Sequence, residues 1–250
     1  MTALLLTLGN LGAGFTAIAL LTVPQLAGWG SPGGSAAVWL IVLAALFDAI
    51  DGPVARRRGT RAIGWGRELD ALADLVSFGI APAVLWGVSF PLGSRVAVAA
   101  GGGLFVLAAA WRLARFLTQE PARGSFTGMP ITAAGLALTA FWLFESATRG
   151  DVVHTLPGLA LMMTCSLLMV SRIVYDKFPE FGLNDRRNNM KWGIAAGAVL
   201  AIAANPPVAG LGVALLYAAH GPIRAGYRLL RAGDEQHEEG AVADRPEGSR

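Results

Sequence analysis

Cysteine and charge are both scarce in this sequence, and each scarcity excludes a class of protein or site. The one cysteine, Cys165, excludes an intramolecular disulfide and a thiolate metal site. Charged residues are only 15% of the 250 residues, whereas hydrophobic residues are 54% and the mean hydropathy is +0.53. No basic soluble domain is present to bind nucleic acid, although the formal net charge is +3. The histidines, His154, His220 and His237, show no metal-ligand spacing.

Long apolar runs dominate the sequence instead, and each is long enough to cross about 30 Å of hydrocarbon as a helix. The sequence therefore predicts an all-α, polytopic integral membrane helix bundle, with six core transmembrane helices plus a C-terminal pair. The predicted segments are 3–24, 34–54, 70–90, 94–115, 129–147, 152–171, 188–205 and 207–229. One membrane domain is expected over residues 1–231, and the acidic, polar residues 232–250 are expected to form a disordered cytoplasmic tail.

Basic residues predict the orientation of these segments. If the loop at 54–69 is cytoplasmic, all of the 20 Lys and Arg residues except Arg95 and Arg149 fall on the same side. Such an asymmetry is typical of a multi-pass protein of the cell membrane whose basic loops face the cytoplasm. The basic rim then lies beside anionic lipid headgroups.

Four aspartates gather at this predicted cytoplasmic face: Asp48 and Asp51 end one apolar segment, and Asp70 and Asp74 begin the next. Spacings of three and four residues place each pair on one face of a helix. Four converging carboxylates repel one another unless cations lie between them, and hard oxygen ligands favour Mg²⁺, Mn²⁺ or Ca²⁺ over zinc. The alternative is that the carboxylates only pair with nearby arginines; a solvated rim position is expected for Arg57, Arg58 and Arg61.

The aspartates belong to a longer pattern, D-A-I-D-G-P-V-A-R, a nine-residue spacer, then G-R-E-L-D-A-L-A-D. This pattern resembles the signature of the CDP-alcohol phosphotransferases, membrane enzymes that make phospholipids. The resemblance implies a site that holds Mg²⁺ or Mn²⁺, expected to be two ions. It implies metal ligands at Asp48, Asp51, Asp70 and Asp74, with Asp74 also the general base. It further implies that Asp51, Gly52, Arg56 and Gly66 bind the CDP-lipid.

Other segments resemble the membrane-type phosphatidylserine synthases within this family. They lie, in the same order, at 7–15, 69–82, 112–116, 126–131 and 169–172. That resemblance implies CDP-diacylglycerol and L-serine as substrates and phosphatidylserine and CMP as products. Arg112, Arg115 and Arg172 are the candidates to bind the acceptor or a phosphate, since an arginine fork suits a carboxylate. Leu117 stands where this subfamily usually has Asn.

Several alternatives stay open at this point. The same chemistry could use glycerol 3-phosphate, inositol phosphate or choline as acceptor, or an ether lipid as donor. A cation-coupled transporter would also need intramembrane carboxylates, but it would usually place them near the bilayer midplane within paired inverted repeats. Asn10 could contact the nucleotide or bond to a neighbouring helix, and the latter is favoured. Membrane lipids are expected around the bundle, and the family resemblance implies a homodimer.

Overall fold

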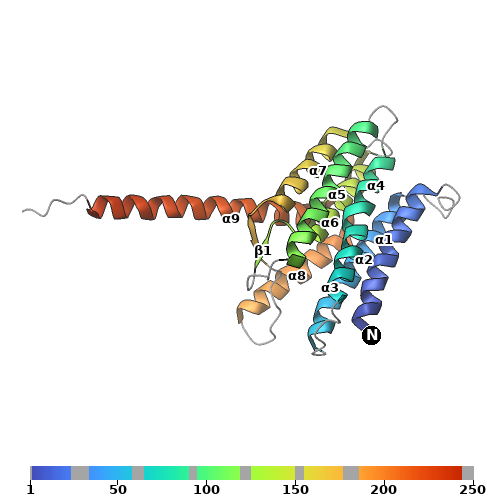
Figure 1. Cartoon of the computed structure of the whole chain (residues 1–250), viewed down its shortest axis with the longest axis horizontal. Coiled ribbons are helices and arrows are strands. Elements are labelled where there is room, and N and C mark those ends of the chain that lie inside the picture. The colour runs from blue at the N-terminus through green and yellow to red at the C-terminus, as the bar shows by residue number, and fades with distance from the viewer. Residues whose placement is uncertain are drawn as a thin grey trace, which may run out of the picture.

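The computed structural model describes residues 2–23, 34–57, 65–89, 95–118, 125–149, 155–176 and 186–243. Most of them are helical, and one short two-stranded sheet completes the fold (Figure 1). The elements in chain order are α1 (Thr2–Thr22), α2 (Gly34–Arg57), α3 (Gly66–Asp74), η1 (Leu75–Ile80), α4 (Ala81–Val88), α5 (Arg95–Thr118), β1 (Ser125–Thr127), α6 (Ile131–Arg149), α7 (Thr155–Val170), β2 (Val174–Asp176), α8 (Arg186–Ala204) and α9 (Pro206–Ala243).

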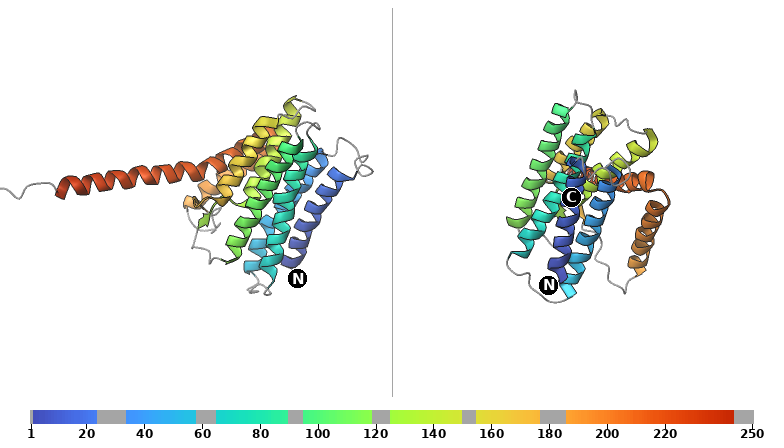
Figure 2. Two further views of the ribbon diagram at one scale, coloured as in Figure 1. Left: turned by 45° about the horizontal axis from the view of Figure 1, so that its top comes forward. Right: turned by 90° about the vertical axis from the view of Figure 1, so that its right-hand side faces the viewer.

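The predicted all-α membrane bundle is confirmed. Within the described ranges, five helical stretches are long and apolar enough to cross a membrane, and α7 is an apolar helix of 16 residues. The five stretches are Leu4–Thr22, Gly34–Asp51, Gly66–Val88, Val96–Thr118 and Ile131–Thr148. Helices α1 to α7 lie side by side in one bundle (Figures 1 and 2). A full set of eight spans stays a prediction.

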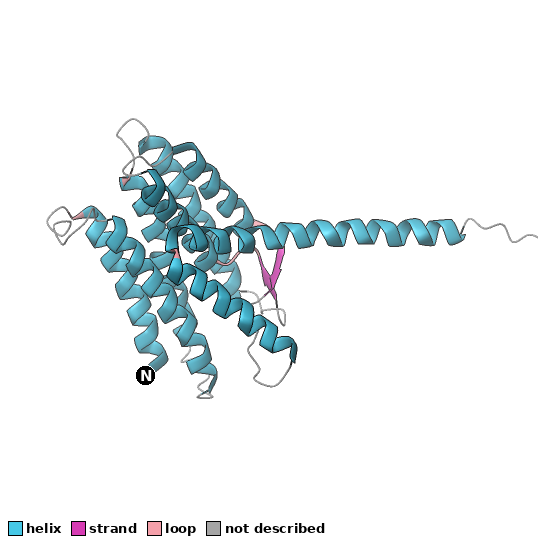
Figure 3. Ribbon diagram, turned by 180° about the vertical axis from the view of Figure 1, so that it is seen from behind, coloured by secondary structure: helices cyan, strands magenta, loops and turns pink. Residues whose placement is uncertain are grey.

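The C-terminal helices differ in direction from the rest of the bundle. Helix α9 runs across the direction of the bundle helices and extends far beyond them, while α8 lies to one side and packs on α9 (Figures 1, 2 and 3). The two helices are joined by Asn205 alone, and Pro206 and Pro207 begin α9. Asn205 accepts a hydrogen bond from the Val208 amide through Oδ1 at 3.4 Å, as a helix N-cap does. Proline in the first turn of a helix suits such an abrupt start.

Helix α9 continues to Ala243, past residue 232, where the sequence predicts that a disordered tail begins; disorder of the tail stays a prediction. The composition of this stretch suits a helix, because Ala, Glu, Arg and Leu are common in 228–243 and are strong helix formers. Its glycines, Gly233 and Gly240, each cost about 1 kcal/mol relative to Ala and do not end the helix. Residues 244–250 lie outside the described part of the chain.

The stretch α3–η1–α4 passes through the centre of the bundle, where Phe78 and Trp86 are fully buried. Its middle turn, η1, is a π-helix that begins directly after Asp74. Pro82 follows in the first turn of α4. A proline has no N–H, and its ring crowds the carbonyl four residues earlier, so the wider π-turn accommodates it without breaking the span. π-turns are often found at functional sites.

Two close helix contacts hold η1 in place. A Cβ added to Gly14 of α1 would lie 2.7 Å from the Ser77 Cα, and one added to Gly135 of α6 would lie 2.5 Å from the Phe78 carbonyl oxygen. Only glycine therefore permits these approaches from the two sides. Small residues of this kind let helices pack closely where lipid offers no hydrophobic driving force. The segment that carries Asp70 and Asp74 is thus fixed against both α1 and α6.

The sheet closes the end of the bundle at which α5 and α7 finish. β1 pairs with β2 in antiparallel register, with Phe126 opposite Tyr175. Figure 3 shows the two strands beside the base of α9. The connection between β1 and α6 turns at Gly128, whose φ of +82° favours glycine. A Cβ there would also lie 2.4 Å from the Met169 carbonyl oxygen, so no other residue fits this turn without strain.

Candidate active site

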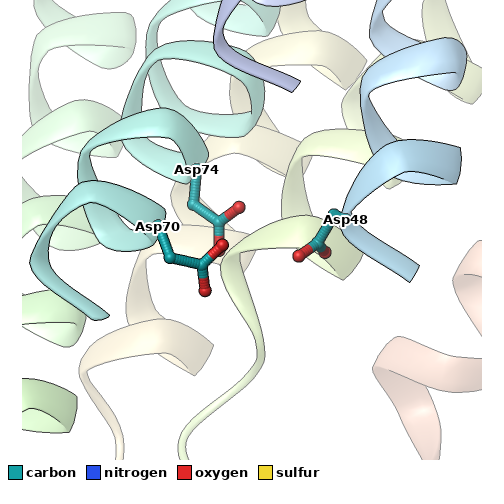
Figure 4. A group of neighbouring side chains, drawn as sticks. All are labelled: Asp48, Asp70 and Asp74. Carbon is teal, nitrogen blue, oxygen red and sulfur yellow. The ribbon is translucent and has the colours of Figure 1, made fainter. Parts of the chain in front are cut away.

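Three of the four predicted metal ligands meet in space. Asp70 and Asp74 project from the same face of α3, and Asp48 faces them from α2 (Figure 4). One carboxylate oxygen from each lies within 4.8 Å of the others. The spacing of four residues accounts for the first pair, and the antiparallel passage of α2 and α3 supplies the third group. Three carboxylates this close favour a bound cation, because otherwise their charges repel one another.

Asp51 is not one of the three aspartates that meet, but it lies on α2 only three residues after Asp48. It is buried, and its Oδ2 accepts a hydrogen bond from Thr7 Oγ1 at 2.6 Å. Its Oδ1 is also buried and has no hydrogen-bond partner among the described residues. A buried carboxylate oxygen without a donor is costly unless a cation or another donor reaches it. The four aspartates therefore fit a hard divalent metal such as Mg²⁺ or Mn²⁺.

Helix α1 supports the carboxylates from one side. The Asn10 side chain donates from Nδ2 to Asp74 Oδ1 at 3.1 Å, and Ser77 Oγ donates to the Asn10 carbonyl at 2.9 Å. The favoured sequence interpretation of Asn10, a bond to a neighbouring helix, agrees with this contact. Thr7, three residues earlier on the same face, holds Asp51. Such outer contacts fix the orientation of ligating carboxylates.

Two of the supporting hydroxyls were not predicted from the sequence. The first is the hydroxyl of Thr7. Thr7 and Asn10 lie three residues apart in an apolar segment, a spacing that indicates a shared polar face, but the sequence prediction included only Asn10. Thr132 donates from Oγ1 to Asp48 Oδ2 at 3.3 Å. It lies 84 residues away along the chain, at the start of α6, and nothing in its local sequence indicates this contact.

Of the three predicted arginines, Arg112 is the one whose charge acts on the carboxylate cluster. It is buried in α5, and its charge interacts with those of Asp74 and Asp48. Its guanidinium carbon lies 5.9 Å from the centre of the Phe116 ring, and that of Arg67 lies 5.5 Å from the same ring. A cation over an aromatic face is held by the ring's quadrupole. A buried cation beside the cluster can neutralise its negative charge or bind a substrate phosphate.

Arg115, one turn further, makes contacts of a different kind. Its Nη1 donates to the Val170 carbonyl at 3.1 Å, and its Nη2 lies within hydrogen-bond distance of three further carbonyls. Those carbonyls belong to Thr127, Met169 and Ser171, at 2.7, 3.2 and 3.3 Å. The guanidinium therefore joins the end of α5 to β1 and to the end of α7. These hydrogen bonds give Arg115 a structural role that requires no bound ligand.

Arg172 lies on the surface of a pocket of about 900 Å³ beside the end of α5. The pocket is lined by Trp111, Ala114, Arg115, Thr118, Thr127, Val170 and Arg172. Helical spacing places Trp111, Arg115 and Thr118 on one face of α5, and Arg112 and Phe116 on a neighbouring face. Of the three predicted arginines, Arg115 and Arg172 thus line this pocket, whereas Arg112 does not.

The remaining predicted site residues are described only in part. Gly66 is the first residue of α3, one turn before Asp70. Gly52 and Arg56 fall in the last two turns of α2, and the direction of the Arg56 side chain lies outside what the structure describes. Arg58 and Arg61 lie between the described ranges. A role for Gly52, Arg56 and Gly66 in binding the CDP-lipid stays a prediction.

Comparison with known proteins gives a consistent result. The model of the family CDP-alcohol phosphatidyltransferase matches residues 1–171. The archaetidylserine synthase of Methanothermobacter thermautotrophicus is 36% identical over 149 residues, which cover 59% of this chain and 61% of that protein, less than two thirds of its length. Two proteins named CDP-diacylglycerol–serine O-phosphatidyltransferase are also similar. The one from Methanocaldococcus jannaschii is 37% identical (74% of this chain, 82% of that protein), and the one from Helicobacter pylori is 33% identical (75% and 78%).

The family match covers more than half of the chain and includes all four aspartates, Asp48, Asp51, Asp70 and Asp74. It also includes the supporting polar residues of α1. The geometry of the cluster and the match point to the same kind of protein. This chain is a member of the CDP-alcohol phosphatidyltransferase family, embedded in a membrane by its apolar helices.

Proposed function

We propose that this protein transfers a phosphatidyl group from CDP-diacylglycerol to the hydroxyl of L-serine, giving phosphatidylserine and CMP. The observation that supports this most directly is the convergence of Asp48, Asp70 and Asp74 within 4.8 Å in a chain of this family. The names of two similar proteins support serine as the acceptor. The proposal places the reaction in phospholipid synthesis.

The proposed reaction is a substitution at phosphorus. A bond forms between the serine hydroxyl oxygen and the phosphorus that carries diacylglycerol, and the bond from that phosphorus to CMP breaks. Asp74 accepts the proton of the hydroxyl, since Asn10 orients its carboxylate by holding one oxygen. Asp48 and Asp70 lie close enough to Asp74 to share bound cations with it. Catalysis of such a transfer depends mainly on position and on the neutralisation of charge.

Mg²⁺ or Mn²⁺, with two ions expected, would be held by Asp48, Asp51, Asp70 and Asp74. When bound, these ions supply charge neutralisation at the phosphates and at the departing CMP. Thr7 and Thr132 keep their hydrogen bonds to Asp51 and Asp48, and so fix the direction of these carboxylates.

The arginines receive different roles in this proposal. Arg112, beside Asp74 and Asp48, binds a phosphate of the CDP-lipid. Arg172 is exposed in its pocket and forms no hydrogen bond with another described residue, so it is the better candidate for the serine carboxylate. Arg115 has its terminal nitrogens engaged by carbonyls and is assigned no ligand here.

We further propose that the site faces the cytoplasm and that two copies of the chain associate as a homodimer in the cell membrane. Sidedness is supported by the bias of the basic residues, since only Arg95 and Arg149 fall on the opposite side in the predicted topology. Association into a dimer is supported by family resemblance alone. Cross-linking in native membranes tests the dimer, and accessibility of a cysteine introduced at residue 60 tests the sidedness.

An ether-lipid donor is the second candidate, because a protein named archaetidylserine synthase is 36% identical to this chain. Both donors carry the same CDP headgroup, so a site that binds this headgroup suits either of them. Purified protein should therefore be offered CDP-diacylglycerol and its ether-linked counterpart in parallel, each with Mn²⁺ and L-serine. The product is identified by mass spectrometry. A higher kcat/KM for the ether-linked donor would reassign the substrate while keeping the reaction.

A panel of acceptors tests the serine assignment. L-Serine, glycerol 3-phosphate, inositol phosphate and choline are compared at equal concentration with CDP-diacylglycerol and Mn²⁺, and CMP is measured. The proposal expects CMP release with L-serine at least about tenfold above the other acceptors, because a site that binds a carboxylate and an ammonium group rejects analogues lacking them. Preferential release with another alcohol would exclude serine as the acceptor.

A further inference from the structure

The pocket beside the end of α5 combines apolar and cationic groups. Its lining includes the apolar residues Trp111, Ala114 and Val170 and the basic residues Arg115 and Arg172. None of its described lining residues is acidic. Trp111, Ala114 and Arg172 are exposed, so the pocket opens at the outer surface of the bundle. A cavity with this lining suits a ligand that has an anionic part and an apolar part.

Two rows of exposed apolar side chains lead from the pocket along the bundle. Their members are Leu104, Leu107 and Trp111 on α5, and Met163, Leu167 and Val170 on α7. Spacings of three and four residues place each row on one face of its helix, and α5 packs along α7. Both rows, together called the α5–α7 face, end in the pocket, because Trp111 and Val170 line it. Apolar surface that leads into a cationic pocket matches acyl chains joined to an anionic headgroup.

The length of the α5–α7 face matches one leaflet of a bilayer. Thr118 lines the pocket and also ends Val96–Thr118, one of the stretches long enough to cross a membrane, so the pocket lies at the membrane boundary. Leu104 lies 11 residues before Arg115, which is roughly 16 Å along an α-helix. Half of the hydrocarbon core of a bilayer measures about 15 Å. Trp111, near the boundary, is the kind of side chain that is enriched at membrane–water interfaces.

Arg172 is the cation of this pocket that a headgroup can reach. It is exposed and forms no hydrogen bond with another described residue, whereas Arg115 donates to four backbone carbonyls. The planar fork of an arginine binds a phosphate through two parallel hydrogen bonds. Basic pockets between membrane helices on the cytoplasmic side suit anionic headgroups, and the bias of the basic residues predicts the cytoplasm at this end of the bundle.

From these observations we infer that the pocket and the α5–α7 face bind an anionic phospholipid of the surrounding membrane, with its phosphate at Arg172 and its acyl chains along α5 and α7. None of the four aspartates lines this pocket. The lipid site goes beyond the proposed reaction but shares one residue with it, because Arg172 is also the candidate for the serine carboxylate. Anionic lipid should therefore compete with L-serine, and phosphatidylserine would inhibit its own synthesis. Only this consequence rests on the proposed function.

Quenching of Trp111 fluorescence by brominated lipid tests the site without turnover. The full-length chain is placed in phosphatidylcholine nanodiscs that contain a minor fraction of brominated phosphatidylglycerol, phosphatidylserine or phosphatidylcholine, without serine, metal or CDP-lipid. The difference between wild type and Trp111→Phe gives the signal of Trp111. We expect both anionic lipids to be enriched about tenfold over phosphatidylcholine beside Trp111, the scale of one hydrogen bond to a charged group. Equal quenching by phosphatidylcholine, or enrichment of phosphatidylserine alone, would overturn the inference.

Two arginine variants separate the pocket from the charge of the surrounding surface. Arg172→Gln should lower the enrichment to the level of phosphatidylcholine, with an unchanged melting temperature, because the side chain is exposed. Arg67→Gln removes another exposed arginine, on α3, which does not line the pocket, and it should keep the enrichment of the wild type. Enrichment that survives in Arg172→Gln, or that is lost equally in both variants, would contradict a site at this pocket.

Two further measurements identify the occupant. L-Serine should displace the anionic lipid if Arg172 binds both; enrichment that persists at saturating L-serine would keep the lipid site and remove Arg172 from the acceptor site. A second copy of the chain is the competing occupant of the α5–α7 face. Absence of quenching by every brominated lipid, together with disulfide cross-linking between Leu167→Cys copies, would assign this face to a dimer and overturn the inference.

Discussion

Arg115 and Arg172 are predicted to have different roles. Mutation of Arg115 should lower the stability of the protein, whereas mutation of Arg172 should weaken the binding of serine. Arg115→Met keeps the aliphatic length of the side chain and removes every contact between the guanidinium and the carbonyls. The Nη1 bond to Val170 is lost, together with those from Nη2 to Thr127, Met169 and Ser171. Nη2 has two hydrogens for its three acceptors, so about three full hydrogen bonds disappear.

At about 1 kcal/mol each, three lost bonds predict a decrease of about 3 kcal/mol in the free energy of unfolding. For a chain of this length, 1 kcal/mol shifts the melting temperature by roughly 2–4 °C, so the midpoint should fall by about 10 °C. Arg172→Met makes the same chemical change at an exposed position and should leave the melting temperature within a degree or two. It should instead raise the KM for L-serine if Arg172 binds the serine carboxylate.

Both variants are measured in the same detergent, by thermal unfolding and by CMP release over a range of L-serine concentrations. Below its melting temperature, Arg115→Met should retain the wild-type KM for L-serine. An unchanged melting temperature together with a raised KM in Arg115→Met would refute the reasoning, because the guanidinium would then be shown to bind the acceptor. A lower melting temperature in Arg172→Met would contradict its assignment as an exposed ligand-binding group.

Two further predictions concern α1. Thr7→Val removes the only described donor to the Asp51 carboxylate and should raise the Mn²⁺ concentration for half-maximal activity about tenfold, as loss of an outer hydrogen bond to a metal ligand typically does; an unchanged metal requirement would count against Asp51 as a ligand. Gly14→Ala places a Cβ 2.2 Å from Ser77 Oγ and should lower stability by about 1–3 kcal/mol, whereas Gly12→Ala, with nothing within 4 Å, should not. Equal melting temperatures for these two variants would contradict the packing of α1 on η1.

The backbone outline of this protein could be predicted from sequence because its signals are local. Apolar runs of the right length indicate spans, and the four-residue spacing of Asp70 and Asp74 places both on one helix face. The convergence of this pair with Asp48 could also be predicted, because a short basic connection joins the two spans that carry these aspartates. The role of Arg115 could not be predicted in this way, because three of the carbonyls it bonds lie 54–56 residues away.

At the C-terminal end, the direction of the helices depends on tertiary contacts that the sequence does not indicate. The direction of α9 depends on the one-residue connection at Asn205 and on the docking of Tyr175 at the carbonyl that Pro222 frees. A hydropathy pattern contains neither contact. The π-turn after Asp74 has a local cause in Pro82, but whether a helix kinks, widens or ends at a proline depends on its neighbours, here Gly14 and Gly135.

The central claim is that the carboxylate cluster performs transfer to serine with Asp74 as the base. It is tested most directly by L-serine-dependent CMP release in wild type, Asp74→Asn and Glu68→Gln. Glu68 lies on the same helix but is exposed, so its variant controls for the loss of a carboxylate on α3. The account predicts that Asp74→Asn lowers kcat at least about 100-fold while Glu68→Gln keeps wild-type activity. Wild-type turnover in Asp74→Asn, or CMP release that does not depend on L-serine, would contradict it.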